Sequence, residues 1–118
     1  NRWHKQVAAE LSGFDELDDA GRHRLRKRVK RLRYAVEFAA ALFEARRVRR
    51  YLKPLRALQE QLGLLNDVAV GLQGYRGAAA ADPGAAFALG WLAARRDRLL
   101  AGCVPALRAL AKARRFWK

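Results

Sequence analysis

The segment from His23 to Glu37 constrains the fold of this chain most strongly, because its residues follow a helical period. At 3.6 residues per turn, four apolar residues recur on one face: Leu25, Val29, Leu32 and Val36. A second set of residues is centred roughly 130° away around the same helix. We call this set the basic row: His23, Arg26, Lys27, Lys30, Arg33 and Tyr34. The segment therefore predicts a helix that buries one face and presents cations along another.

The basic row holds like charges close together, which suits a helix that meets a polyanion. A run of charged residues is more often a solvated surface than a binding face. This run, however, contains almost no acidic residues among its cations. Glu37 is the exception, and its position four residues after Arg33 allows the two side chains to pair. The other arginines of the segment are expected to be ordinary surface residues: Arg22, Arg24, Arg28 and Arg31.

Composition favours an all-α fold and an anionic partner. The 118 residues include no Thr and no Ile, so residues that favour sheets are scarce. The chain carries 25 Lys plus Arg against 11 acids, a net charge of +14. Such an excess points to nucleic acid, an anionic membrane surface or another polyanion. The length suits one domain, residues 1–118.

Catalytic and metal-binding patterns are absent from the sequence. Neither His4 nor His23 belongs to a metal-ligand motif, and Cys103 is expected to be a small core residue. We therefore predict a protein that is not an enzyme and that uses no cofactor and no metal. No apolar run approaches the ~20 residues that cross a bilayer. The single cysteine fits a cytoplasmic location, and a chain that starts at Asn1 without Met is expected to be a fragment.

The hydrophobic pattern predicts an antiparallel four-helix bundle with short loops. The expected helices are residues 3–11, 20–44 and 48–75, and a last helix that Asp82 and Pro83 begin. Asp18 or Asp19 should cap the second helix, and residues 74–84 should form a linker. Pro54 fits only near the start of its helix or at a slight kink. Pro105 predicts a kink or break at residues 101–104.

Two further features could belong to a binding site. Polar residues border the core stripe of the third helix: Lys53, Arg56, Gln59, Gly63, Asn66 and Asp67. Either they are exposed residues, or Gly63 permits close helix approach while Gln59 and Asn66 hold neighbouring basic side chains. Arg95 projects from the expected apolar face of the last helix: Ala88, Trp91, Leu92, Leu99 and Gly102. An arginine there must reach water, pair with Asp67 or meet a buried anion.

Three signatures together resemble the CHAD family (conserved histidine α-helical domain). They are the run His23–Tyr34, then Leu58-Gln59 with Leu62-Gly63 and Asn66-Asp67, and the closing Phe116-Trp117. They occur in the family's order and span nearly all of the chain from residue 18 onward. Arg115 stands where many relatives have proline.

The resemblance implies an all-helical domain of two four-helix bundles related by approximate two-fold symmetry, of which this chain is similar to the C-terminal half. It implies binding of inorganic polyphosphate, without established catalysis, in the cytoplasm or at polyphosphate granules. His23, Arg26, Lys27, Lys30 and Arg33 would face the polyphosphate, with Arg56 and Arg95 on neighbouring helices. A missing N-terminal half, or a second copy in a homodimer, would supply the other wall of the groove.

The spacing of the basic row agrees with a linear polyanion, because successive cations on one helix face lie about 5 Å apart along the axis. Nucleic-acid binding would use the same cations but also needs base readout or stacking. Asn, Gln and exposed aromatic residues are expected to be sparse near the row, with Tyr34 its only aromatic. A module that binds an acidic protein partner is a further alternative.

Overall fold

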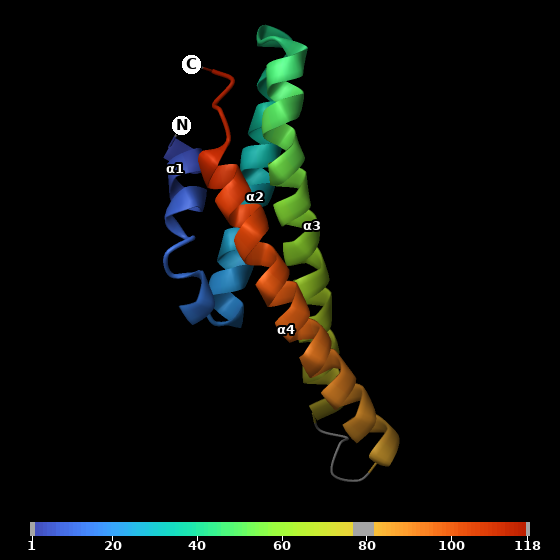
Figure 1. Ribbon diagram of the computed structural model, residues 1–118. Coiled ribbons are helices and arrows are strands. Elements are labelled where there is room, and N and C mark those ends of the chain that lie inside the picture. Colours follow the sequence, from blue (N-terminus) through green and yellow to red (C-terminus); the bar gives the residue numbers. More distant parts are fainter. Residues whose placement is uncertain (1, 77–81, 118) are drawn as a thin grey trace.

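The computed structural model describes residues 2–76 and 82–117, and every regular element in these ranges is helical (Figure 1). The all-α prediction is therefore confirmed. The elements are α1 (Arg2–Ala9), η1 (Phe14–Glu16), α2 (Asp19–Ala39), η2 (Ala40–Leu42), α3 (Ala45–Arg76) and α4 (Pro83–Lys112), where η marks a single 3₁₀ turn.

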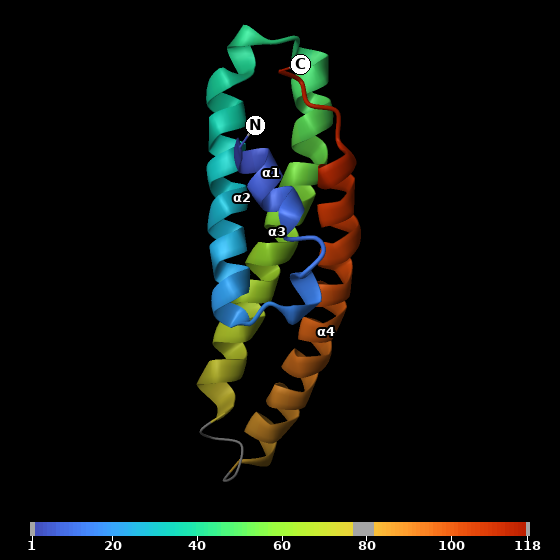
Figure 2. The ribbon, with the colours of Figure 1, turned by 90° about the vertical axis from the view of Figure 1, so that its left-hand side faces the viewer.

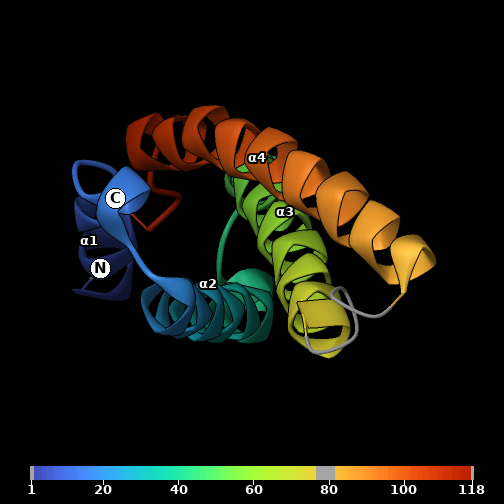
Figure 3. The same ribbon diagram turned by 90° about the horizontal axis from the view of Figure 1, so that it is seen from below.

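A long antiparallel hairpin of α3 and α4 carries the other two helices (Figure 2). α2 packs along α3, and the short α1 packs against both α2 and α4. Seen end-on, α2 and α4 lie on opposite sides of this arrangement (Figure 3). The predicted antiparallel bundle thus surrounds only one half of the hairpin. The other half projects past α1 and α2, and the molecule measures 57 × 25 × 19 Å.

The core contains the apolar stripe predicted for the second helix, whose four residues are all buried. Cys103 is also fully buried, as expected for a packing residue, and this burial raises the pKa of its thiol to about 11. The predicted apolar face of α4 is wrong at Trp91, which is 52% exposed. The buried residues of α4 are Ala85, Leu99, Cys103, Leu107 and Leu110.

Both predicted caps are present. The backbone N–H of Gly21 donates to Asp18 Oδ1 at 2.7 Å, so Asp18 is the cap of α2. Asp82 caps α4 through the N–H of Gly84 at 2.9 Å, with Pro83 in the first turn. The helix boundaries differ from the expected ones. α2 ends at Ala39 rather than near residue 44, and α3 continues to Arg76 into the expected linker, of which residues 77–81 lie outside the described part.

Neither proline breaks its helix. Of the kink or break predicted at residues 101–104, the break is therefore wrong. Pro105 has no N–H for the Ala101 carbonyl, but both residues are exposed and water can hydrate that carbonyl. Pro54 lies nine residues past Ala45 and not in the first turn of α3. Because Pro54 has no N–H, the carbonyl of Arg50 loses its helical hydrogen bond, and Arg50 is also exposed.

Candidate functional site

The basic row lies on the side of α2 that faces away from the core. His23, Lys27, Lys30 and Tyr34 are exposed, while the row's two arginines, Arg26 and Arg33, are half-buried. The structure therefore presents the row as a nearly continuous strip along one helix. Its two edges meet different neighbours, α3 on the arginine side and α1 on the other.

On the first edge, Arg33 is held by its own helix and by α3. Its Nε donates to Glu37 Oε1 at 2.9 Å, and its Nη1 donates to Gln59 Oε1 at 2.9 Å. Arg56 Nη2 reaches the same Glu37 oxygen at 3.5 Å. The structure thus brings Arg33 and Arg56 together at one carboxylate and gives Gln59 its expected role of holding a basic side chain. We call these four residues the α2–α3 seam: Arg33, Glu37, Arg56 and Gln59.

Glu37 is the acid that neutralises this edge of the row. The hydrogen bond from Arg33, together with the nearby charges of Arg33 and Arg56, holds the pKa of its carboxyl below the usual range. Glu37 therefore stays ionised well into mildly acidic solution. An anion that binds at the seam must compete with this carboxylate for both guanidinium groups.

At the N-terminal end of the row, His23 and Arg26 line a cavity of about 50 Å³ between α2 and α3. Asn66 lines the same cavity, so it does lie beside basic side chains as expected. The expected role of Gly63 is wrong, because a Cβ added at Gly63 would meet no atom within 4 Å. Close approach occurs at Gly102 instead, where an added Cβ would lie 3.0 Å from Gln61 Oε1.

On the second edge, Lys27, Lys30 and Tyr34 border an apolar hollow between α1 and α2. Lys30 Nζ lies 5.8 Å from the centroid of the Tyr34 ring, within the range of a cation–π contact. Trp3 and Phe38 also line this hollow, and Phe38 is 92% exposed. The expectation that exposed aromatic residues are sparse near the row is therefore wrong. The spacing of Phe38, four residues after Tyr34, could have revealed it.

Arg95 lies apart from the row, because α4 packs along α3 and α1 and not along α2. Its guanidinium carbon lies 5.8 Å from the centroid of the Trp91 ring. The alternative in which Arg95 pairs with Asp67 does not apply, since this pair is not among the ion pairs of residues 2–76 and 82–117. Arg95 is half-exposed and so reaches water.

His4, which sequence reasoning set aside, is the buried histidine of the chain's described part. Its Nδ1 shares a hydrogen bond of 2.7 Å with the hydroxyl of Tyr51. Burial, with a smaller contribution from the charge of Arg115, lowers the pKa of His4 below 6.5. Burial likewise raises the pKa of Tyr51. The pair is therefore neutral at pH 7 and serves packing.

No cluster of three or more His, Cys, Asp or Glu side chains that could hold a metal ion occurs in residues 2–76 and 82–117. In those same ranges, no helix has both the length and the apolar character needed to cross a membrane.

Comparison with known families identifies the first two thirds of the chain. The family model for the CHAD domain matches residues 1–76, which include the basic row and the whole α2–α3 seam. The match ends with α3, so the closing Phe116-Trp117 signature lies beyond it. Comparisons with curated proteins and with solved structures give no match.

Proposed function

Because the chain belongs to the CHAD domain family, we propose that it binds inorganic polyphosphate along the basic row and the α2–α3 seam. The observation that carries this proposal is the meeting of Arg33 and Arg56, from two helices, at the edge of a row of exposed cations. Planar guanidinium groups pair well with phosphate oxygens. The row extends the charge along about three helical turns, as a linear chain of phosphates requires.

The proposed role is binding without catalysis. The groups that meet at the seam are guanidinium groups, an amide and one carboxylate. These recognise an anion by charge and hydrogen bonding, and none needs to exchange a proton with it. We assign Tyr34 to the edge of this site through its contact with Lys30. Arg95 is proposed to contribute only through the general positive field, because it lies apart from the row.

We propose that a second polypeptide surface completes the site, either an N-terminal half of the domain or a second copy of this chain. What supports this is the projecting half of the hairpin, where large apolar side chains are exposed: Val70, Tyr75, Phe87 and Trp91. Groups of exposed apolar residues commonly mark protein interfaces. Light scattering with and without polyphosphate tests the second copy, and a monomer in both conditions would contradict it. The proposed place of action is the cytoplasm, at polyphosphate granules.

Single-stranded nucleic acid is the second candidate ligand, because exposed aromatic rings lie beside the lysines of the row. Tyr34 and Phe38 are 55% and 92% exposed, and Lys27 and Lys30 border the same hollow. Proteins that bind single strands combine such rings with cations, since bases stack on the rings. Polyphosphate has no bases and gains nothing from Phe38.

A competition titration separates the two ligands. Long-chain polyphosphate competes with single- and double-stranded nucleic acid at matched phosphate concentration and ~150 mM salt. We expect polyphosphate to bind best and to lose at least about tenfold in affinity in the Arg26→Ala/Lys30→Ala variant. The control is Arg24→Ala/Arg108→Ala, which removes the same charge from exposed positions outside the row. Equal losses in both variants, or equal affinity for all three ligands, would reduce the row to a general polyanion surface.

A further inference from the structure

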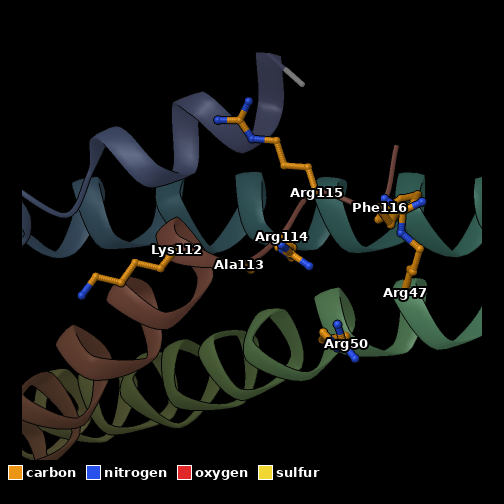
Figure 4. Close-up of a pocket in the computed structure, with 7 residues that line it drawn as sticks. All are labelled: Arg47, Arg50, Lys112, Ala113, Arg114, Arg115 and Phe116. Carbon is orange, nitrogen blue, oxygen red and sulfur yellow. The ribbon is translucent and has the colours of Figure 1, made fainter. Parts of the chain in front are cut away.

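A second group of cations lines a cavity at the end of the molecule where α3 begins and α4 ends (Figure 4). Its volume is about 420 Å³, and we call it the end cavity. It is lined by Arg47, Arg50, Lys112, Ala113, Arg114, Arg115 and Phe116. None of these residues belongs to the basic row or to the α2–α3 seam.

The end cavity combines two segments that are far apart in the sequence. α3 places Arg47 in its first turn and Arg50 three residues later, so both side chains project from the same helix face. α4 ends at Lys112, and Ala113 has an extended conformation with ψ of 139°. The chain then leaves the helix and carries Arg114 and Arg115 past the start of α3, with Arg115 extending toward α1 (Figure 4).

Aromatic packing fixes the second segment in this position. Phe116 is only 4% exposed and makes edge-to-face contacts with three rings. The centroid distances are 5.0 Å to Phe43, 5.5 Å to Tyr51 and 4.9 Å to Trp117. These contacts hold the neighbouring arginines beside α3 even though like charges repel one another.

The lining of the end cavity holds cations but no Asp or Glu among the residues that the structure describes. Within residues 2–76 and 82–117, Arg50, Lys112 and Arg114 form no ion pair with an acid. The first turn of α3 adds the positive end of its helix dipole at Arg47. An anion in this cavity would therefore relieve repulsion among Arg50, Lys112 and Arg114.

We propose that the end cavity binds a compact, highly charged phosphate compound, a short oligophosphate or the terminal group of a longer chain. Cations on one helix follow a line, whereas Arg50 and Arg114 line the same cavity from two separate segments of the chain, which matches clustered negative charge. Most of the lining side chains are exposed, so a ligand can reach them. This site goes beyond the function proposed above and does not depend on it.

The test is calorimetric titration with sodium tripolyphosphate at ~150 mM salt. The Arg50→Ala/Arg114→Ala variant should lose at least about tenfold in affinity. The matched control, Arg49→Ala/Arg108→Ala, removes two exposed arginines of α3 and α4 that lie outside the cavity and should lose less than about twofold. Circular dichroism checks that all variants keep their helices. Equal losses in both variants, or no loss in the first, would overturn the proposal.

Two comparisons separate this site from the basic row and identify the source of its ligand. Loss of tripolyphosphate binding in Arg26→Ala/Lys30→Ala alone would assign the binding to the row and overturn the end site, while leaving the proposed function intact. Long-chain polyphosphate that displaces tripolyphosphate in proportion to its concentration of chain ends would identify the ends as ligand. No displacement would identify free oligophosphate. Displacement in proportion to total phosphate would contradict a compact ligand.

Discussion

The basic row and the end cavity gather cations in two different ways. The row is a property of one helix, because the backbone of α2 places residues 23–34 in line as soon as it forms. The end cavity exists only when residues 47–50 and 112–115 are brought together by the packing of Phe116. The difference teaches that a linear charge pattern needs only secondary structure, whereas a convergent one needs a stable tertiary fold. Variants should therefore affect the two surfaces separately.

The largest effect is expected for Phe116→Ala, which should break the end cavity and spare the basic row. Removing this buried ring should cost about 3 kcal/mol in the free energy of unfolding. It should also weaken tripolyphosphate binding more than long-chain binding. Urea denaturation and calorimetry measure the two effects. Phe38→Ala is the control, since its ring is 92% exposed and should change stability by no more than about 0.5 kcal/mol. Similar costs in both variants would contradict the anchoring role of Phe116.

The pH dependence of stability should sharpen the comparison, because His4 belongs to the packing beneath the end cavity. The pKa of His4 is lower in the folded protein than its usual value of 6.5. Between these two values the unfolded chain binds a proton that the folded chain does not, so stability falls as pH drops below 6.5. We expect the melting temperature to fall by a few degrees as the pH drops below 6.5. In the His4→Asn variant the melting temperature should depend less steeply on pH. Identical slopes in the two proteins would rule out this histidine as the source.

A smaller change is expected at the seam for Glu37→Gln. This variant removes the carboxylate shared by Arg33 and Arg56 and leaves both guanidinium groups for the ligand. Long-chain polyphosphate should bind about two- to fivefold more tightly, since an ion pair at the surface competes only weakly with the ligand. Glu60→Gln, an exposed residue of α3, controls for the change in net charge. If Glu37→Gln left the affinity for polyphosphate unchanged, the ligand would not reach the seam.

The smallest effect is a gain of about 0.5–1 kcal/mol in stability for Gly63→Ala, because alanine favours the helix and its Cβ meets nothing within 4 Å. Polyphosphate binding should not change. Gly102→Ala is the matched control, since its Cβ would crowd Gln61 and should gain less. Thermal melting followed by circular dichroism measures both. Loss of binding in the Gly63→Ala variant would instead place the ligand in the space beside this residue.

Short-range features of the fold and site followed from the sequence. The two faces of α2, the caps Asp18 and Asp82 and the Arg33–Glu37 pair all depend on residues within a few positions of each other. Helical period and capping chemistry suffice to predict them. The contact between Arg33 and Gln59 was an open alternative in the sequence, because it depends on how α2 packs against α3.

Features that depend on long-range packing were missed. The helical period of α4 predicts that Trp91 is buried in the core. This half of the hairpin projects beyond α1 and α2 (Figure 2), so the ring is exposed. Pro105 suggested a break, yet an exposed carbonyl tolerates the lost hydrogen bond. No local sequence pattern predicts the end cavity, since its cations come together only after Phe116 is buried.

Binding along α2 is tested directly by mapping backbone amide chemical shifts of the ¹⁵N-labelled chain during titration with long-chain polyphosphate. We expect the largest changes at residues 23–34 of α2 and at residues 56–59 of α3, where the row and the seam lie. Largest changes on the projecting half of the hairpin, at residues 70–76 and 83–91, with α2 unaffected, would contradict it.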